Sequence, residues 1–215
     1  MFPTATLRLA PRRTLVRPLL GAALGVLMAT SAARAQETRR TVGVTFHRST
    51  SSRAIASQAV SVSSVEVDVS FPILDSDWWR IEYEIAIPVA LVHDNPTGAV
   101  SSFGDTWVVW NPPPPTTTLG IGAQPVGIRA LVGPRRARLQ LDASGGFIRF
   151  GTPLLAANGT RFNFTADAGV GVRLALPDRG YAVAGYRLHH VSNGGLGEVN
   201  PGLDAHELYL GVLFE

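Results

Sequence analysis

The sequence predicts an all-β fold, an eight-stranded antiparallel transmembrane β-barrel of the outer membrane. Three observations predict this fold. Apolar and polar residues alternate over long stretches, which is typical of strands with one apolar face. The first residues have the layout of an export signal, and no later apolar run is long enough for a membrane-spanning helix. An exported membrane protein of this kind can cross the bilayer only as a closed barrel.

Residues 1–35 are interpreted as a secretory signal peptide. They combine arginines near the start, an apolar run at 19–28, and the small residues Ala33 and Ala35 of an A-x-A cleavage site. The apolar run is too short for a retained membrane anchor. Residues 36–215 are therefore expected to form the mature protein, whose length suits a single barrel domain.

The charges of the mature chain are close to balanced. Of the 19 basic residues, all of them arginine, five lie in the signal segment together with no acidic residue, so 14 remain against 16 acidic residues. The basic character of the whole chain therefore gives no reason to expect a nucleic-acid partner. The absence of cysteine excludes a disulfide-stapled scaffold, and the charged content of 16% is low beside about a quarter in soluble domains.

Eight strands are expected from the sequence pattern. The second reads SVEVDVSF, the third WRIEYEIAIPVAL and the sixth RFNFTADAGVGVRLAL, and in each of them apolar residues occupy every second position. The eighth reads DAHELYLGVLFE, and its apolar face ends on a phenylalanine, as in the last strands of many outer-membrane proteins. The expected ranges are about 40–48, 62–71, 78–92, 119–131, 136–149, 161–176, 181–192 and 204–214.

The connections differ at the two ends of the expected barrel. Those after the second, fourth and sixth strands are short (PILDSD, VGPR and PDRG), whereas those after the first, third and seventh are longer and rich in Gly, Ser, Pro or Asn. The end of the fifth strand stays open because DASGG interrupts its pattern. Short turns at one end and long loops at the other are typical of outer-membrane barrels. A soluble, lipocalin-like barrel with its apolar face inward is the alternative, because it shows the same alternation.

The stretch HHVSNGGLGEVNPGLD joins the last two strands and carries the residue types of a hydrolytic site. The even positions of the seventh strand are apolar and should face lipid, so His190 and Ser192 face lipid as well, whereas His189 points into the barrel. Counting back along the last strand places Asp204 on the same outer face and Glu207 inside. The sequence therefore predicts one outward-facing patch at the loop end of two adjacent strands.

This patch contains a hydroxyl, an imidazole and a carboxylate. A nucleophile, a base and a group that orients the base are the minimum set for covalent acyl transfer. The alternative is that the three residues are ordinary interfacial side chains at the point where the strands leave the bilayer. In that case the protein is a non-catalytic small barrel, such as an adhesin, a structural protein or a narrow pore. A soluble lipid carrier is a third hypothesis.

The segment GYRLHHVSNGGLGEVNPGLD resembles the signature of the lipid A 3-O-deacylases, the PagL-like outer-membrane esterases. In that family a His-x-Ser-Asn segment is followed by a Gly-bearing loop with an Asn, and then by a Gly and an acid two residues later. The resemblance extends upstream through GGFIRFGTPLLAANGTRFNFTADAGVGV and covers about the last 75 residues. The matching positions are His190, Ser192, Asn193, Gly195, Asn200, Gly202 and Asp204.

The resemblance implies a catalytic site that faces the outer leaflet. Ser192 would be the nucleophile, His190 the base and Asp204 the acid that orients the imidazole. The sequence departs from the family here, because the family's reference acid is a Glu, which is one methylene longer. Donors for the oxyanion and contacts to the substrate are expected from the glycine-bearing loop, namely Asn193, Gly194, Gly195 and Asn200.

The expected activity is hydrolysis of the 3-O-linked acyl chain of lipid A in the outer leaflet of the cell outer membrane. No cofactor and no metal are expected, because the sequence has no metal or nucleotide motif and the proposed chemistry needs neither. Lipid A, or lipopolysaccharide, is the expected partner. The sequence does not decide between a monomer and a homodimer.

Overall fold

A computed structural model describes the chain from residue 40 onward, with short gaps. The predicted signal peptide lies outside the described residues. Within these residues the structure contains no helix that is long and apolar enough to cross a membrane. The described ranges are 40–54, 57–96, 99–103, 106–110, 115–156, 158–177 and 180–215, and side chains are described in them except at 57–59, 95–96, 99–103 and 106–110.

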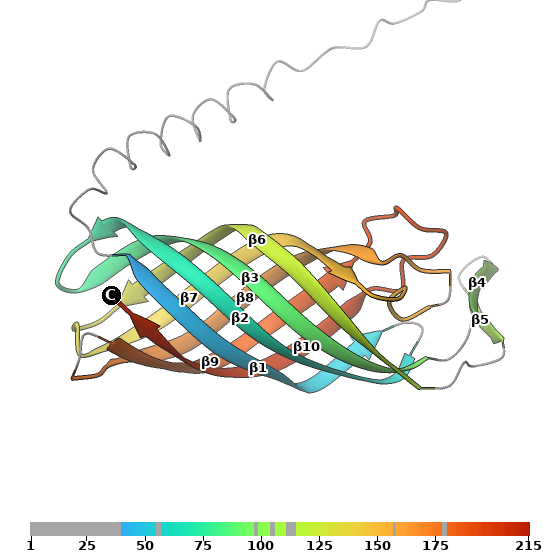
Figure 1. Ribbon diagram of the computed structural model, residues 1–215, viewed down its shortest axis with the longest axis horizontal. Coiled ribbons are helices and arrows are strands. Elements are labelled where there is room, and N and C mark those ends of the chain that lie inside the picture. The colour runs from blue at the N-terminus through green and yellow to red at the C-terminus, as the bar shows by residue number, and fades with distance from the viewer. Residues whose placement is uncertain are drawn as a thin grey trace, which may run out of the picture. The chain divides into compact units, whose positions relative to one another are not determined.

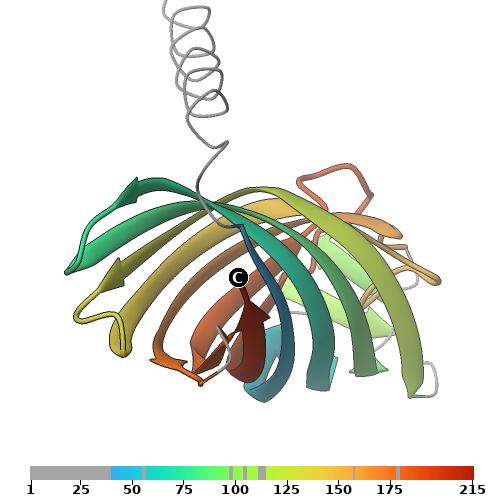
Figure 2. The same ribbon diagram turned by 60° about the vertical axis from the view of Figure 1, so that its left-hand side comes forward.

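Eight antiparallel strands close into a barrel, as the sequence predicts (Figures 1 and 2). Neighbouring strands in the sheet are mostly neighbours in the chain, and the first strand pairs with the last to close the barrel. The strands tilt around the wall, as closure of a sheet requires. They are β1 (Thr41–Ala54), β2 (Ser57–Asp75), β3 (Trp79–Pro96), β6 (Thr116–Val132), β7 (Ala137–Phe150), β8 (Phe162–Ala175), β9 (Gly180–Ser192) and β10 (Leu203–Phe214).

Two expectations about the connections are wrong. The expected long loop after the first strand is absent, because β1 and β2 extend until only residues 55–56 separate them. The segment after β3 is not plain loop, because it contains a two-stranded sheet of β4 (Ala99–Phe103) and β5 (Thr106–Trp110). Alternation of apolar and polar residues predicts a strand only where one face of that strand meets lipid. It therefore does not predict strand segments that extend beyond the bilayer.

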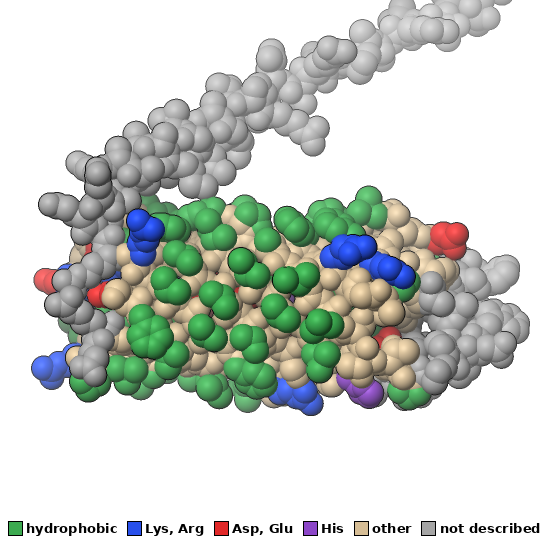
Figure 3. Space-filling model, in the orientation of Figure 1, with side chains coloured by type: hydrophobic (Ala, Val, Ile, Leu, Met, Phe, Trp, Pro, Cys, Tyr) green, Lys and Arg blue, Asp and Glu red, His purple; other side chains and the backbone are tan. Residues whose placement is uncertain are grey.

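The outer wall of the barrel is apolar. In β1 every second residue from Val42 to Phe46 is exposed, and the residues between them are buried. The same alternation continues in β7, β8 and β10. Figure 3 shows hydrophobic side chains spread over the visible face of the wall with few charged side chains among them. This arrangement is that of a membrane barrel, and it overturns the soluble alternative, in which the apolar face would point inward.

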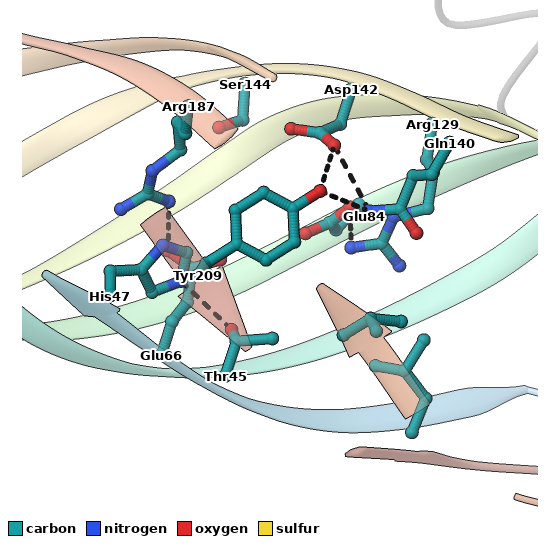
Figure 4. A pocket seen from close by; sticks show the side chains of 12 residues that line it. Thr45, His47, Glu66, Glu84, Arg129, Gln140, Asp142, Ser144, Arg187 and Tyr209 are labelled. Carbon is teal, nitrogen blue, oxygen red and sulfur yellow. Dashed lines mark hydrogen bonds and ion pairs between the residues drawn. The ribbon is translucent and has the colours of Figure 1, made fainter. Parts of the chain in front are cut away.

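The interior is filled with charged and polar side chains. Arg129 Nη2 lies 2.6 Å from Glu84 Oε2, and Arg173 donates to Glu82 at 3.1 and 3.2 Å. Figure 4 shows Tyr209 at the centre of this region, with its hydroxyl directed at Asp142. Buried charges are costly unless they are paired, so the cross-barrel pairs favour one strand register over its alternatives.

Candidate active site

The strands β9 and β10 bring His190 and Asp204 together. The two residues are direct Cα partners in the antiparallel register. His190 Nδ1 lies 2.6 Å from Asp204 Oδ1, a hydrogen bond in which the ring N–H donates to the carboxylate. Both side chains face outward, with 50% and 69% of their surfaces exposed. The imidazole is therefore oriented by the acid that the sequence predicts for this position.

Two nearby residues on the other face of these strands, His189 on β9 and Glu207 on β10, point into the barrel. His189 Nδ1 lies 2.5 Å from Asp167 Oδ1, and both side chains are buried. Glu207 is fully buried and accepts from Arg187 at 2.9 and 3.1 Å. The predicted facing is confirmed at these positions, and Glu207 is separated from the imidazole of His190 by the wall of the barrel.

Ser192 lies two residues beyond His190 on the same face of β9. Side chains two apart in a strand are spaced by about 7 Å along it. Among the described residues, no hydrogen bond joins the Ser192 hydroxyl to the imidazole. Since Asp204 occupies Nδ1, the nitrogen that remains for Ser192 is Nε2.

The loop after β9 is organised by the buried side chain of Asn193. Its Nδ2 donates to the Val199 carbonyl at 2.7 Å, and its Oδ1 accepts from the Gly195 N–H at 2.9 Å. Its own backbone N–H donates to Asn200 Oδ1 at 3.0 Å. Three of the four residues expected to bind the oxyanion or substrate are therefore joined to one another by hydrogen bonds.

A tight turn gives the fourth residue a different environment. The Leu196 N–H donates to the Asn193 carbonyl at 3.1 Å, and the two central glycines have φ of +62° at Gly194 and +80° at Gly195. These angles are those of a type I′ turn, which glycine adopts without strain. Within the described part of the chain, the Gly194 N–H has no hydrogen-bond partner. The donors left over are thus the Gly194 N–H and the Asn200 amide group.

The comparisons with known proteins decide the family. The family model described as lipid A 3-O-deacylase (PagL) matches residues 77–212, which is more than half of the chain. The chain belongs to this family. The match runs from just before β3 into β10 and includes the His190 and Asp204 pair, Ser192 and the loop between them.

Two solved structures are similar to this chain. The barrel is similar to the crystal structure of the outer membrane enzyme PagL, with 13% sequence identity, a TM-score of 0.54, and coverage of 81% of this chain and 99% of that chain. The crystal structure of Neisserial surface protein A (NspA) also matches, with 15% identity, a TM-score of 0.46, and coverage of 81% and 96%. No curated protein sequence matches the chain. At these identities the first likeness supports the fold alone.

The candidate site has aromatic neighbours that the sequence analysis did not assign to it. Phe164 on β8 is the Cα partner of Ser192, and its ring packs edge-on against Phe162 with centroids 5.5 Å apart. Phe147 on β7 stacks on Phe162 at 5.7 Å. Alternation placed Phe162 and Phe164 on the lipid face, but only the pairing of β8 with β9 brings them beside Ser192. The part of the chain that the structure describes holds no cluster of His, Asp and Glu arranged to bind a metal.

Proposed function

We propose that this member of the family is an outer-membrane esterase that hydrolyses the 3-O-linked acyl chain of lipid A at the outer leaflet. The observation that carries the proposal is the 2.6 Å contact of His190 with Asp204 on the outer surface, on the same face as Ser192. An outward-facing acid and imidazole beside lipid are costly unless they lie at the head-group level or serve a function. A substrate that is itself a membrane lipid reaches such a site without leaving the bilayer.

The proposed reaction proceeds through an acyl-enzyme. His190 Nε2 takes the proton of Ser192 as its Oγ attacks the carbonyl carbon of the ester. The tetrahedral intermediate collapses, the bond between that carbon and the sugar oxygen breaks, and the imidazolium returns the proton to the leaving oxygen. Water then attacks the acyl-enzyme with His190 again as base, the imidazolium returns this proton to Ser192 Oγ as the bond between Oγ and the acyl carbon breaks, and the free fatty acid leaves.

Asp204 fixes the tautomer in this mechanism. By accepting from Nδ1 it leaves Nε2 as the basic nitrogen, and its charge stabilises the imidazolium that forms. The direct register of His190 and Asp204 supports the shorter acid in place of the family's Glu, because opposed side chains in an antiparallel pair are only about 5 Å apart at Cβ. Asp204 therefore reaches the imidazole although its side chain is one methylene shorter than that of Glu.

The loop supplies the oxyanion donors. We assign this role to the Gly194 N–H and the Asn200 amide, since the N–H groups of Asn193 and Gly195 already donate within the loop. Asn193 shapes the loop so that these donors face the ester. Such donors act in the transition state, where negative charge develops on the carbonyl oxygen. The mechanism uses no metal and no cofactor.

The location and processing belong to the same proposal. Residues 1–35 act as the export signal, and the barrel inserts into the outer membrane with its long connections outward. Mass spectrometry of lipid A from cells with and without the protein tests the proposed function. The expected result is a loss of one 3-hydroxyacyl chain from lipid A that depends on the protein. Unchanged lipid A in cells with the inserted barrel would favour the non-catalytic alternative.

A further inference from the structure

Exposed arginines stand on both sides of the candidate site. Arg53 on β1 is the direct Cα partner of Asp204, and both residues are exposed. On the other side Arg161 is exposed at the start of β8, the strand that pairs with β9. Arg149 on β7 is also exposed and lies opposite Phe162, beside Arg161. The mechanism uses none of these three side chains.

These arginines differ from those inside the barrel. Arg129, Arg173 and Arg187 are buried and bound to carboxylates in the lumen. For Arg53 and Arg161, by contrast, no acidic partner is present in the described ranges. A guanidinium facing the hydrocarbon is strongly destabilising at the midplane of the bilayer and much less so near the interface. The positions therefore fit the level of the lipid head groups, where phosphates are the available anions.

The arginines lie at the same level as the catalytic candidates. Arg53 and His190 are both direct partners of Asp204, and the barrel tilt over these two strand steps places Arg53 about two to three residues nearer the loop end than His190, which is roughly the level of Ser192. Arg149 lies two residues beyond Phe147 on β7, and Phe147 shares a row with Ser192 through Phe164. Barrel tilt shifts the level by roughly one to 1.5 residues for each strand crossed, which returns Arg149 to the level of Ser192.

The spacing suits a head group that lies across the site. The strands β10 and β9 lie between Arg53 and Arg161, so three strand spacings of nearly 5 Å separate them, roughly 15 Å along the wall. Long guanidinium side chains on either side of the ester can reach a head group between them. A guanidinium group binds a phosphate through two parallel, charge-assisted hydrogen bonds. A neutral sugar has no charged group that could accept such a pair.

We propose that Arg53 on one side, and Arg161 with Arg149 on the other, form two anion subsites that bind phosphate groups on the sugar head group of the substrate. These subsites orient the lipid so that its ester faces Ser192. The inference rests on the proposed function for the identity of the ligand. It concerns binding, however, and can be measured without turnover.

A binding experiment tests the subsites. The mature protein carrying Ser192→Ala, held in detergent micelles, is titrated with phosphorylated lipid A and with lipid A from which the phosphates have been removed. Arg53→Gln and Arg161→Gln are compared with Arg136→Gln, an exposed arginine in the short turn at the other end of the barrel. We expect each of the first two changes to weaken binding of phosphorylated lipid A about fivefold to tenfold, because one exposed charge-assisted contact is lost. Arg136→Gln should leave it unchanged.

The dephosphorylated lipid separates recognition from general anchoring. If the arginines bind phosphate, Arg53→Gln and Arg161→Gln leave the affinity for dephosphorylated lipid A unchanged, and in the Ser192 enzyme they raise KM more than they lower kcat. The proposal is overturned if the Ser192→Ala protein binds the two lipids with equal affinity. It is also overturned if the arginine substitutions weaken the binding of both lipids equally. If the protein cleaves no ester but its binding of lipid A still depends on Arg53 and on the phosphates, the proposed function is wrong and the anion subsites are supported.

Discussion

His190 on β9 and Asp204 on β10 are opposed across an antiparallel pair, with Nδ1 and Oδ1 2.6 Å apart on the outer surface of the barrel. This contact fixes the imidazole in one tautomer, in which Nδ1 carries the proton and Nε2 is free to accept one. His189, one residue before His190 on β9, and Glu207, three residues after Asp204 on β10, bind other groups inside the barrel. The wall therefore separates two histidines that are adjacent in the chain.

Asp204→Asn should reduce the rate of ester release by several powers of ten. The amide carries no charge and favours the wrong tautomer of His190, which in serine hydrolases costs about 10⁴ in kcat. Asp204→Glu should keep activity, because it restores the acid of the family at a position already within contact distance. Release of fatty acid from lipid A by purified variants measures both. A fully active Asp204→Asn protein would contradict the assignment of Asp204 as the residue that orients His190.

Changes at the inward-facing neighbours should act on stability rather than on the reaction. His189→Ala removes the imidazole that donates to Asp167 Oδ1, whereas Gln124 and Ser144 still donate to Oδ2, and a buried oxygen that loses its hydrogen-bond donor typically costs about 1–3 kcal/mol. Unfolding of the barrel in urea, followed by its mobility on gels without boiling, should show this loss. Activity per folded molecule should stay within a few fold of the unchanged protein, and the same holds for Glu207→Gln. A folded but inactive His189→Ala protein would mean that the site opens into the lumen.

Asn193→Ala should disorganise the loop that carries the oxyanion donors. The substitution removes the side-chain bonds to Val199 and Gly195 from a side chain that is 1% exposed. Cleavage of the 193–202 loop by an added protease should become faster while the barrel stays resistant. We expect kcat to fall by about 10² to 10³, the range seen when an oxyanion donor is lost. Unchanged protease resistance and activity would show that the loop does not depend on Asn193.

The lipid-facing assignment of β10 can be tested by two matched arginine substitutions. Leu210 on β10 and Leu196 in the loop after β9 are both 64% exposed. Leu210→Arg should destabilise the inserted barrel by about 2–4 kcal/mol, because it places a charge in the hydrocarbon. Leu196→Arg should change the free energy of unfolding little, since the loop lies beyond the strands. Equal effects of the two changes would contradict the membrane position of the wall.

The sequence alone predicted much of the fold and the facing of the site residues. Period-two alternation assigns each residue to one face of its strand, so His190, Ser192 and Asp204 were placed outside and Glu207 inside without a structure. The pattern failed at the outer ends of β1 and β2 and at the hairpin of β4 and β5. Strand segments outside the bilayer need no apolar face, so no alternation marks them.

Contacts that depend on register could not be predicted. Arg53 lies more than 150 positions from Asp204 in the chain, yet the closure of β1 on β10 pairs them. Phe164 becomes the partner of Ser192 only through the pairing of β8 with β9. Neither pairing follows from the face on which a residue lies, because alternation does not specify which residue of the next strand stands opposite.

The most direct test of the central claim is a comparison of fatty-acid release by the purified protein and its Ser192→Ala variant. Both are first shown to be folded by heat-modifiable gel mobility, and lipid A in mixed micelles is the substrate. Mass spectrometry should detect one released 3-hydroxy fatty acid per lipid A with the unchanged protein and essentially none with Ser192→Ala, since the nucleophile is gone. Release at a comparable rate from the alanine variant would contradict the account.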